Sequence, residues 1–392
     1  MSVGIALVFV VIFALMGLIL AATPWLMKKQ ECFAVTVPEF AQNDTRLRMF
    51  KHRYAAIMLI VTIANCVIVG AIFLLGASSF EGSSASVGFS TASASLSESS
   101  TFLVWFLIGG SLLPPLISFG LMLYYRRKVT VLKKKEGWVA QRDEHAAVSG
   151  EGDIPKPLSL KWNWLYVAVI ASTALIGFVG YPLMPDMIPM HADFSGNVTD
   201  YEPKSFGVVG FPVFVQIFMA VCFLVCHVMI LRSKQPIDPQ RPITSALAYG
   251  MFARAQTMYL LVVGVLISAA IGLLFMLSAL DWISLGQVAI VIMVLVVAIL
   301  VPGVIISVVY GQSGARMIRR LSESSEILSD DDSYWKLGIF YWNPQDPSVV
   351  LPERFGIGWT FNFARPVSWL VIGSFVVLTI VFIAVIGVLV GV

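Results

Sequence analysis

Long apolar runs, separated by short polar segments, dominate the pattern along this chain. Eight runs are each at least 20 residues long, and none has an Asp, Glu, Lys or Arg in its interior. A helix that crosses a bilayer needs about 20 predominantly apolar residues. The pattern therefore predicts eight transmembrane helices, at residues 3–22, 54–77, 102–125, 163–183, 207–231, 256–280, 286–310 and 367–391.

The composition agrees with a membrane protein. Of the 392 residues, 58% are hydrophobic and only 12% are charged, whereas soluble domains carry about 45–50% apolar and about 25% charged residues. So few charges would not solvate the surface of a soluble chain of this length. The net charge of +3 is too small to indicate a nucleic-acid partner. We expect an all-α polytopic membrane protein that contacts the lipid bilayer and does not bind nucleic acid.

Basic residues alternate between the segments that link the runs. Segments 23–53, 126–162, 232–255 and 311–366 hold 25 of the 26 Lys and Arg residues, and only Lys204 lies in the other linking segments. Because short cytoplasmic loops are enriched in Lys and Arg, the basic segments are predicted to be cytoplasmic. Both termini are then outside.

These boundaries predict a domain organisation. Segment 78–101 is rich in Ser, Ala and Gly and is expected to be a flexible outer loop. A small β-rich cytoplasmic element is expected where two apolar stretches flank the turn signal NPQDP, and segments 31–35 and 353–357 are expected to pair beneath the bundle. The units are 1–125 with helices 1–3, a basic linker 126–162, 163–310 with helices 4–7 and outer loop 182–206, the cytoplasmic β-rich module 311–366, and 367–392 with helix 8.

The segment 181–206 is the outer segment richest in ionisable residues. Pro182, Pro185 and Pro189 stiffen its first half, because proline fixes φ and removes a backbone donor. The sequence Ser-Gly-Asn at 195–197 is typical of a turn that folds the segment back on itself. The side chains of His191 and Asp193 are then expected to face Asp200, Tyr201 and Glu202, and Lys204 is expected to contact Glu202 or Asp193.

Several chemistries fit these residues. An imidazole with carboxylates is a set of ligands that zinc accepts, although the spacing matches no established metal motif. A histidine also titrates near physiological pH and can act as a pH switch. The acidic side chains could also bind a basic peptide or a cation from outside. In the remaining interpretation, the segment has no binding role and is a polar loop that solvates the end of the bundle. HExxH, GxSxG and P-loop motifs are all missing, so we expect no enzyme, no metal and no cofactor.

One resemblance covers much of the chain. The sequence Met187 to His191, followed by Gly196, Asp200-Tyr201 and Lys204, resembles an uncharacterised bacterial family that shares this loop with Sdp-type toxin-immunity proteins. The stretch FGIGWTFNFARP in the cytoplasmic module resembles a second module of that family. The resemblance implies a multi-pass protein of the bacterial cytoplasmic membrane without assigned catalysis. The chain departs from the short Sdp immunity proteins in its extra helices and its module.

Two functional hypotheses follow. The first is a non-enzymatic, immunity- or receptor-like membrane protein that recognises an extracytoplasmic ligand, such as a peptide, at residues 181–206. The alternative is a transporter or permease, or a membrane subunit that works with a partner subunit in a larger complex. Against a coupled transporter, the apolar runs lack the buried charged groups that ion or proton coupling usually needs.

Overall fold

The structure is a computed structural model of the chain, and most of it is helical. It describes residues 2–28, 30–83, 89–138, 154–192, 198–235, 242–317 and 331–390. Among these residues, eight helices are long and apolar enough to cross a membrane. This confirms the eight runs that the hydrophobic pattern predicts, and the chain is a multi-pass membrane protein.

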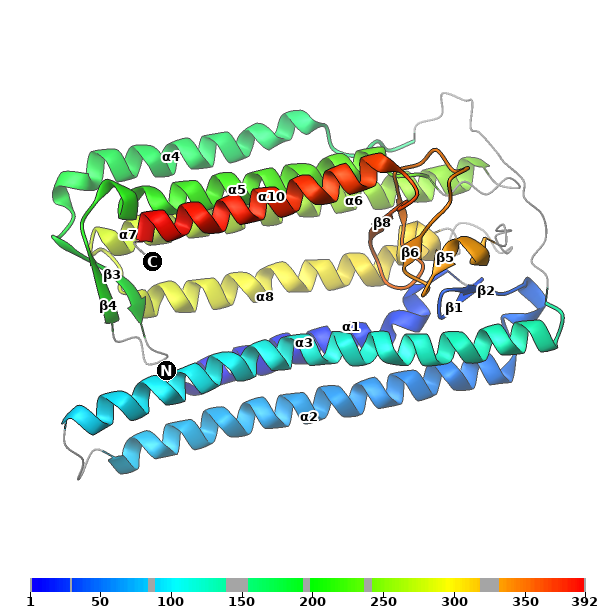
Figure 1. Cartoon of the computed structure of the whole chain (residues 1–392), viewed down its shortest axis with the longest axis horizontal. Helices are drawn as coiled ribbons and strands as arrows, with labels where there is room; N and C mark the ends of the chain where they lie inside the picture. Colours follow the sequence, from blue (N-terminus) through cyan, green and yellow to red (C-terminus); the bar gives the residue numbers. More distant parts are fainter. Residues whose placement is uncertain are drawn as a thin grey trace.

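The first three helices form one part of the bundle (Figure 1). They are α1 (Ser2–Leu26), α2 (Thr45–Ser83) and α3 (Phe89–Lys135). Helices α1 and α2 pack closely at Gly17, where a Cβ atom would lie 2.0 Å from the hydroxyl of Thr62. Asp44 caps the start of α2 by accepting a hydrogen bond of 2.7 Å from the backbone N–H of Arg46.

The expectation of a flexible loop at residues 78–101 is wrong for most of that stretch. Helix α2 continues to Ser83 and α3 already begins at Phe89, and residues 84–88 lie outside the described residues. The stretch contains several Ala residues among its Ser residues, and Ala has the highest intrinsic helix propensity. Its polar composition therefore does not interrupt the helices that enter it.

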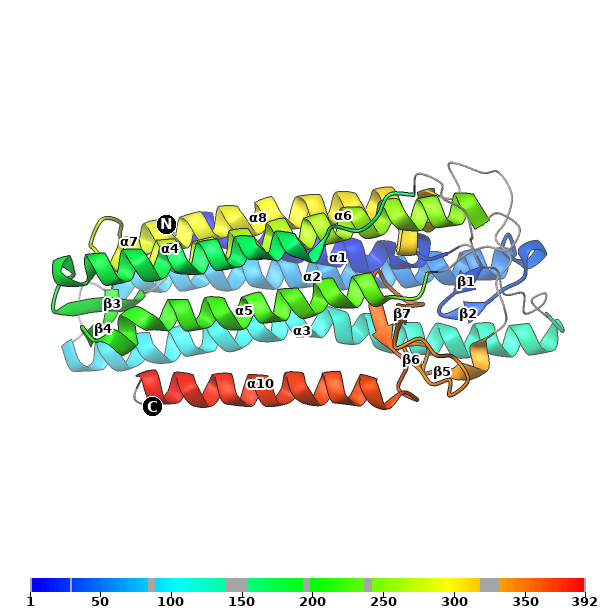
Figure 2. The same ribbon diagram turned by 90° about the horizontal axis from the view of Figure 1, so that it is seen from above.

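The remaining helices form the rest of the bundle. Helix α6 continues through one π-helical turn into α7, and α10 lies at the edge of the bundle beside α5 (Figure 2). These elements are α4 (Trp164–Gly180), α5 (Phe206–Arg232), α6 (Pro242–Ala269), the π-turn η4 (Ala270–Leu274), α7 (Phe275–Ala279), α8 (Leu285–Tyr310) and α10 (Pro366–Val390).

Polar side chains buried in this part of the bundle are used for packing. Gln216 on α5 donates hydrogen bonds to the hydroxyl of Thr173 and to the carbonyl of Ser268, at 3.0 and 2.8 Å. Gly272 in the π-turn permits this approach, because a Cβ atom there would lie 2.2 Å from the Gln216 amide nitrogen. His227 is buried, and its Nε2 lies 2.8 Å from the carbonyl oxygen of Leu158. These groups therefore link helices to one another and to the segment before α4.

The two ends of the bundle carry different small elements (Figure 1). At one end, here the hairpin end, strands β3 and β4 form a hairpin, and α1 begins and α10 ends there as well. At the opposite end, the module end, lie the other short strands. They are β1 (Glu31–Cys32), β2 (Val35–Thr36), β5 (Trp335–Lys336), β6 (Phe340–Tyr341), β7 (Val350–Pro352) and β8 (Trp359–Phe361).

Each of these short strands pairs with one neighbouring strand in an antiparallel two-stranded sheet, and isolated parallel bridges join Val350 to Ser233 and Tyr341 to Asn362. The predicted β-rich element is therefore confirmed in its strands. The expected pairing of 31–35 with 353–357 is wrong, because β1 pairs with β2 through a tight turn instead. Phe33 and Ala34 in that turn have φ angles of 49° and 58°, a left-handed conformation that is uncommon outside glycine. The two segments meet through side chains: the rings of Phe33 and Phe355 stack at 6.3 Å.

Candidate functional site

The segment 181–206 folds back on itself as the sequence predicts. Strand β3 (Met187–Ala192) pairs antiparallel with β4 (Val198–Pro203). The register brings His191 opposite Asp200, with irregularities on both sides of His191. Residues 193–197, which include Asp193 and the predicted turn, lie outside the described residues.

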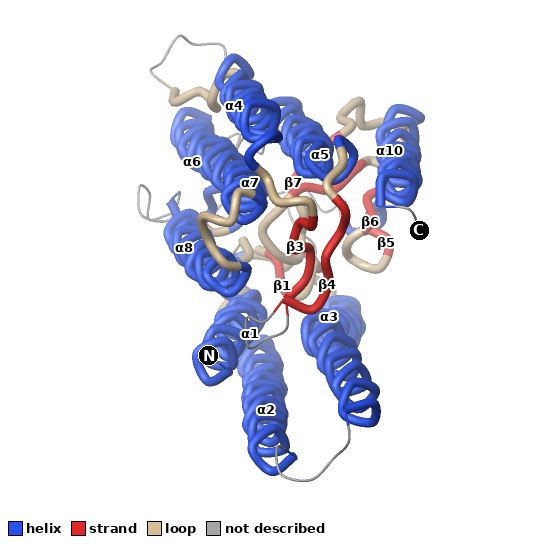
Figure 3. Tube along the Cα trace, turned by 90° about the vertical axis from the view of Figure 1, so that its left-hand side faces the viewer, coloured by secondary structure: helices blue, strands red, loops and turns tan. Residues whose placement is uncertain are grey.

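One side of the hairpin is anchored to the bundle. Ile188 is fully buried and Met184 nearly so, and they pack with apolar side chains of α5 and α7. Strand β3 is the strand that contacts α7 and α8, and Figure 3 shows β4 on the side away from α8. Burying a side chain the size of Ile or Met contributes about 1.5–3 kcal/mol. These buried contacts therefore fix the position of the hairpin on the helices.

Lys204 adds a polar anchor at the base of the hairpin. Its ammonium group donates a hydrogen bond of 2.8 Å to the carbonyl oxygen of Met184 and lies 5.5 Å from the ring centroid of Tyr181. Asp186 is 3.8 Å away but fully exposed, so it contributes little. The predicted contact of Lys204 with Glu202 is not what the structure shows, because the amine bonds to Met184 and lies over Tyr181, and Asp193 lies outside the described residues.

The ring of Tyr181 is itself held in place. It stacks on Phe206, the first residue of α5, with a centroid distance of 4.4 Å and an angle of 6°. Ser205 caps α5 by accepting a hydrogen bond from the backbone N–H of Val208. The stack joins the start and the end of the segment. Sequence reasoning missed Tyr181 and Phe206, although two aromatic residues that bracket a polar segment were a visible signal.

Most of the other predicted residues that the structure describes are exposed, whereas Glu202 is half-buried and lies opposite the buried Ile188. The side chains of His191 and Asp200 are 73% and 57% exposed, with 3.5 Å between His191 Nδ1 and Asp200 Oδ2. Asp200 and Glu202 are two residues apart on β4 and so lie on one face of the strand. Tyr201 points to the opposite face and is 49% exposed. The structure thus brings together His191, Asp200 and Glu202, here called the acidic face, with Tyr201 on the far side of the same strand.

This arrangement places charged side chains at the surface of the protein. Among the described residues, no group of three or more His, Cys, Asp or Glu side chains is placed to hold a metal ion. The acidic face has one imidazole and two carboxylates. Among the described residues, neither carboxylate forms an ion pair with a buried side chain. Such exposed carboxylates attract cationic groups from solution, and the attraction is screened by salt. The open edge of β4 adds unpaired backbone groups that an extended chain can use.

At the module end, charged residues are buried and paired. Arg354 is 5% exposed, and its guanidinium group donates to the carboxylates of Asp331 and Asp332. Lys133 at the end of α3 forms an ion pair of 2.7 Å with Asp332. Asp332 also accepts hydrogen bonds from the backbone N–H and the hydroxyl of Thr36, at 3.0 and 2.9 Å. One carboxylate therefore joins β2, α3 and the strands of the module.

The strained turn of β1 and β2 is held by two arginines. Arg126 on α3 and Arg354 in the module both donate to the carbonyl oxygen of Ala34. Phe33 beside it is fully buried and stacks on Tyr125, with 5.1 Å between the ring centroids. These contacts offset the left-handed backbone, which on its own costs on the order of 1–3 kcal/mol per residue. No motif in the sequence pointed to this network, because its members are far apart along the chain.

Two carboxyl groups of the module have shifted pKa values. Burial raises the pKa of Glu353 to about 7. Burial by itself would also raise the pKa of Asp346, but hydrogen bonds from Lys234 and Ser348 outweigh it and hold that pKa below its usual value. Lys234 follows α5, and its amine lies 2.7 Å from Asp346. The module is therefore attached to α5 as well as to α3.

Two family models match parts of the chain. Residues 168–215 match a domain of unknown function, DUF1648, and this range includes α4, the hairpin and the start of α5. Residues 344–369 match a family of unknown function, DUF5808, which covers strands β7 and β8 of the module. No curated protein matches the chain, and no solved structure does. The two matches fit an uncharacterised family, and each falls on one of the two ends described above.

Proposed function

We propose that this protein is a non-enzymatic, receptor- or immunity-like protein of the bacterial cytoplasmic membrane that recognises a basic peptide at the β3–β4 hairpin. The observation that carries the proposal is the acidic face, which is exposed on a hairpin that is itself anchored by buried contacts. The hairpin end, with both termini, is the outer side, because Lys and Arg are concentrated in the segments at the module end.

The open edge of β4 defines how the peptide binds. An extended peptide adds a third strand beside β4, so that backbone hydrogen bonds supply affinity and alternate side chains supply specificity. Lys or Arg side chains of the peptide then meet Asp200 and Glu202, while Tyr201 contacts apolar side chains on the other face of β4. The likeness of this segment to Sdp-type immunity proteins supports a secreted peptide as the ligand. The match to an uncharacterised domain covers residues 168–215 and so contains the whole hairpin.

Binding of a defined peptide tests the proposed site. Full-length protein is reconstituted in phosphatidylcholine nanodiscs and titrated with a labelled eight-residue peptide of alternating Lys and Val. Asp200→Asn combined with Glu202→Gln is expected to weaken binding about tenfold, since two attractive charges are lost. Asp281→Asn is the matched control, because Asp281 is a carboxylate at the same end in the α7–α8 connection.

Two further results distinguish this mode from diffuse attraction. A peptide with proline at every second position is expected to bind poorly, because proline cannot donate a backbone hydrogen bond to β4. If Asp281→Asn weakens binding as much as the double substitution does, the hairpin is not the site. If the proline peptide binds as well as the Lys-Val peptide, strand addition is wrong and only the charge contact remains.

The orientation is tested separately. Thr199→Cys places a thiol on the exposed strand β4, and Lys336→Cys places one on the exposed surface of the module. A membrane-impermeant maleimide is expected to label Thr199→Cys in intact bacterial cells and Lys336→Cys only after the membrane is opened. The reverse pattern would place the hairpin in the cytoplasm and overturn the proposed function.

A further inference from the structure

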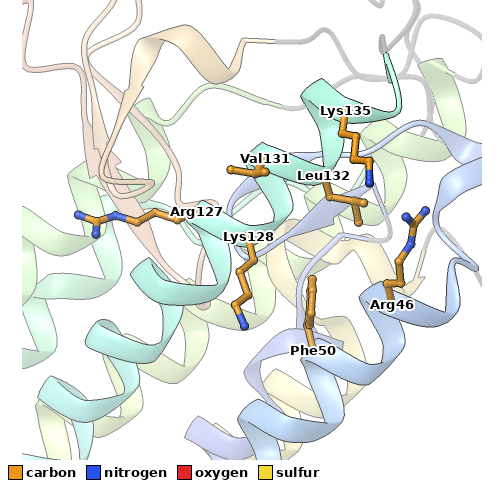
Figure 4. A pocket seen from close by; sticks show the side chains of 7 residues that line it. All are labelled: Arg46, Phe50, Arg127, Lys128, Val131, Leu132 and Lys135. Carbon is orange, nitrogen blue, oxygen red and sulfur yellow. The ribbon is translucent and has the colours of Figure 1, made fainter.

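A pocket with a volume of about 340 Å³ lies between the module ends of α2 and α3 (Figure 4). Its apolar wall consists of Phe50, Val131 and Leu132, and basic side chains from both helices surround it. Small-molecule sites typically have volumes of about 300–1,000 Å³. The pocket is therefore large enough for a polar headgroup with the first carbons of a chain.

The pocket begins at the level of the membrane surface. Trp25 near the end of α1 is 37% exposed and lies 5.4 Å from the ring of His52, and Tyr124 on α3 is 51% exposed. Exposed Trp and Tyr side chains near the ends of membrane helices mark the headgroup region. Lys128 is one helical turn beyond Tyr124, and Lys135 is about 10 Å further along the axis. The pocket thus extends from the headgroup region away from the hydrocarbon.

The charges around the pocket are not all equivalent. Arg46 is occupied, since it forms ion pairs of 2.7 Å with both Asp44 and Glu136. Lys128 lies beside two aromatic rings, with its amine 4.5 Å from the ring centroid of Tyr124 and 5.8 Å from that of Phe50. Lys135 is exposed. Figure 4 shows the guanidinium of Arg127 pointing away from Lys135 and Arg46. In the described part of the chain, no carboxylate is within ion-pair distance of Lys128 or Lys135.

We propose that this pocket binds the headgroup of an anionic phospholipid from the adjoining leaflet. The phosphate lies between Lys128 and Lys135, and the glycerol and first acyl carbons lie on Phe50 and Val131. Val131 is 66% exposed, so the lipid covers an apolar side chain that otherwise faces water. Lys128 fits this role, because a lysine held over aromatic rings keeps its ammonium group at the membrane surface.

The assignment depends on both charge and apolar contact. A free phosphate would meet the lysines but would leave Phe50 and Val131 uncovered. A neutral lipid would cover these side chains but would not neutralise the positive charges of the two lysine amines. Basic residues beside a membrane attract anionic lipid even without a pocket, so the test compares positions that carry equal charge.

The probe is phosphatidylglycerol added to full-length protein in an uncharged detergent, with bound lipid counted by native mass spectrometry. Phosphatidylcholine with the same acyl chains is the reference. Lys128→Gln combined with Lys135→Gln is expected to reduce retention of phosphatidylglycerol about tenfold. Arg53→Gln combined with Lys134→Gln removes the same charge from exposed positions of the same two helices that do not line the pocket, and is expected to leave retention near that of the unsubstituted protein.

Three outcomes overturn the proposal. Equal losses in the two double variants would mean diffuse attraction. Displacement of the lipid by an equal concentration of inorganic phosphate or glycerol phosphate would mean a soluble anion site. Equal retention of phosphatidylcholine and phosphatidylglycerol would mean that charge has no part in binding. If the pocket double variant does not fold, Lys135→Gln alone replaces it, because this side chain is exposed, and a loss of about threefold is then expected.

Discussion

The two ends of the bundle use charged residues in opposite ways. At the module end, the side chain of Arg354 is 6% exposed and binds the carboxylates of Asp331 and Asp332, and Asp332 also binds Lys133 and the backbone of β2. At the hairpin end, His191 and Asp200 are mostly in solvent and have only each other at 3.5 Å. The only basic side chain there, Lys204, is turned inward to a carbonyl oxygen. One end therefore uses its charges to hold segments together, and the other leaves its carboxylates free.

This difference separates structural charges from candidate binding charges. A buried ion pair costs much to desolvate, so removing one partner leaves an uncompensated charge. An exposed ion pair contributes little to stability. Its replacement is therefore expected to change ligand binding and not the free energy of unfolding. Stability and binding measurements on the two ends should therefore give opposite patterns.

Replacing the buried arginine should have the largest effect. Arg354→Met leaves Asp331 and Asp332 without their main partner and removes one of the two donors to Ala34. We expect a loss of about 4 kcal/mol in the free energy of unfolding, seen as a lower thermal midpoint of the full chain in detergent. Lys336→Met is the control, since Lys336 is exposed in the same module. Equal midpoints for the two variants would show that the network is not important for stability.

The change of stability with pH should reflect the titration of the Glu353 carboxyl group. Its pKa in the folded protein is about 7, raised by burial from 4.5. Because the folded state holds this proton more tightly than the unfolded state, its contribution is fully present below pH 4.5 and is lost as the pH rises to about 7. Glu353→Gln keeps the neutral form. It should be more stable than the unsubstituted protein by about 2–3 kcal/mol at pH 8 and differ little at pH 5. A difference that is the same at both pH values would contradict this account.

The lysine anchor of the hairpin should give a smaller, local effect. Lys204→Met removes the hydrogen bond to Met184 and the contact with Tyr181 while keeping most of the apolar stem. We expect about 2 kcal/mol less protection of the β3–β4 amides from hydrogen exchange, with the module unchanged. Asp186→Asn serves as the comparison, because Asp186 is fully exposed, and should leave exchange unaltered. Faster exchange throughout the chain would mean that Lys204 supports the whole fold.

The acidic face should give the smallest effect on stability. Asp200→Asn with Glu202→Gln keeps the size of both side chains and removes charges that form no buried ion pair among the described residues, and the thermal midpoint is expected to stay within the experimental error of the unsubstituted protein. The same variant is expected to lose peptide binding. A lower midpoint would show that these carboxylates hold the hairpin in place, and their availability to a ligand would then be in doubt.

The helices and the hairpin could be predicted from the sequence because their signals are local. Each membrane helix is one continuous apolar run, and the antiparallel pairing of 187–192 with 198–203 follows from two short segments around a turn signal. The direction of Lys204 could not be predicted, since it depends on a carbonyl group 20 residues earlier in the chain. The same holds for the module end, where Arg354 bonds to Ala34, 320 residues away. Contacts at that distance leave no pattern in a single sequence.

Reversing the sign of the acidic face tests the central claim most directly. Asp200→Lys combined with Glu202→Lys leaves Ile188 and Met184 unchanged and makes the acidic face of β4 basic. We predict that this variant, in phosphatidylcholine nanodiscs, no longer binds the alternating Lys-Val peptide. It is expected to bind an alternating Glu-Val peptide of equal length, which the unsubstituted protein does not bind. Continued binding of the Lys-Val peptide with unchanged affinity would contradict recognition by the hairpin.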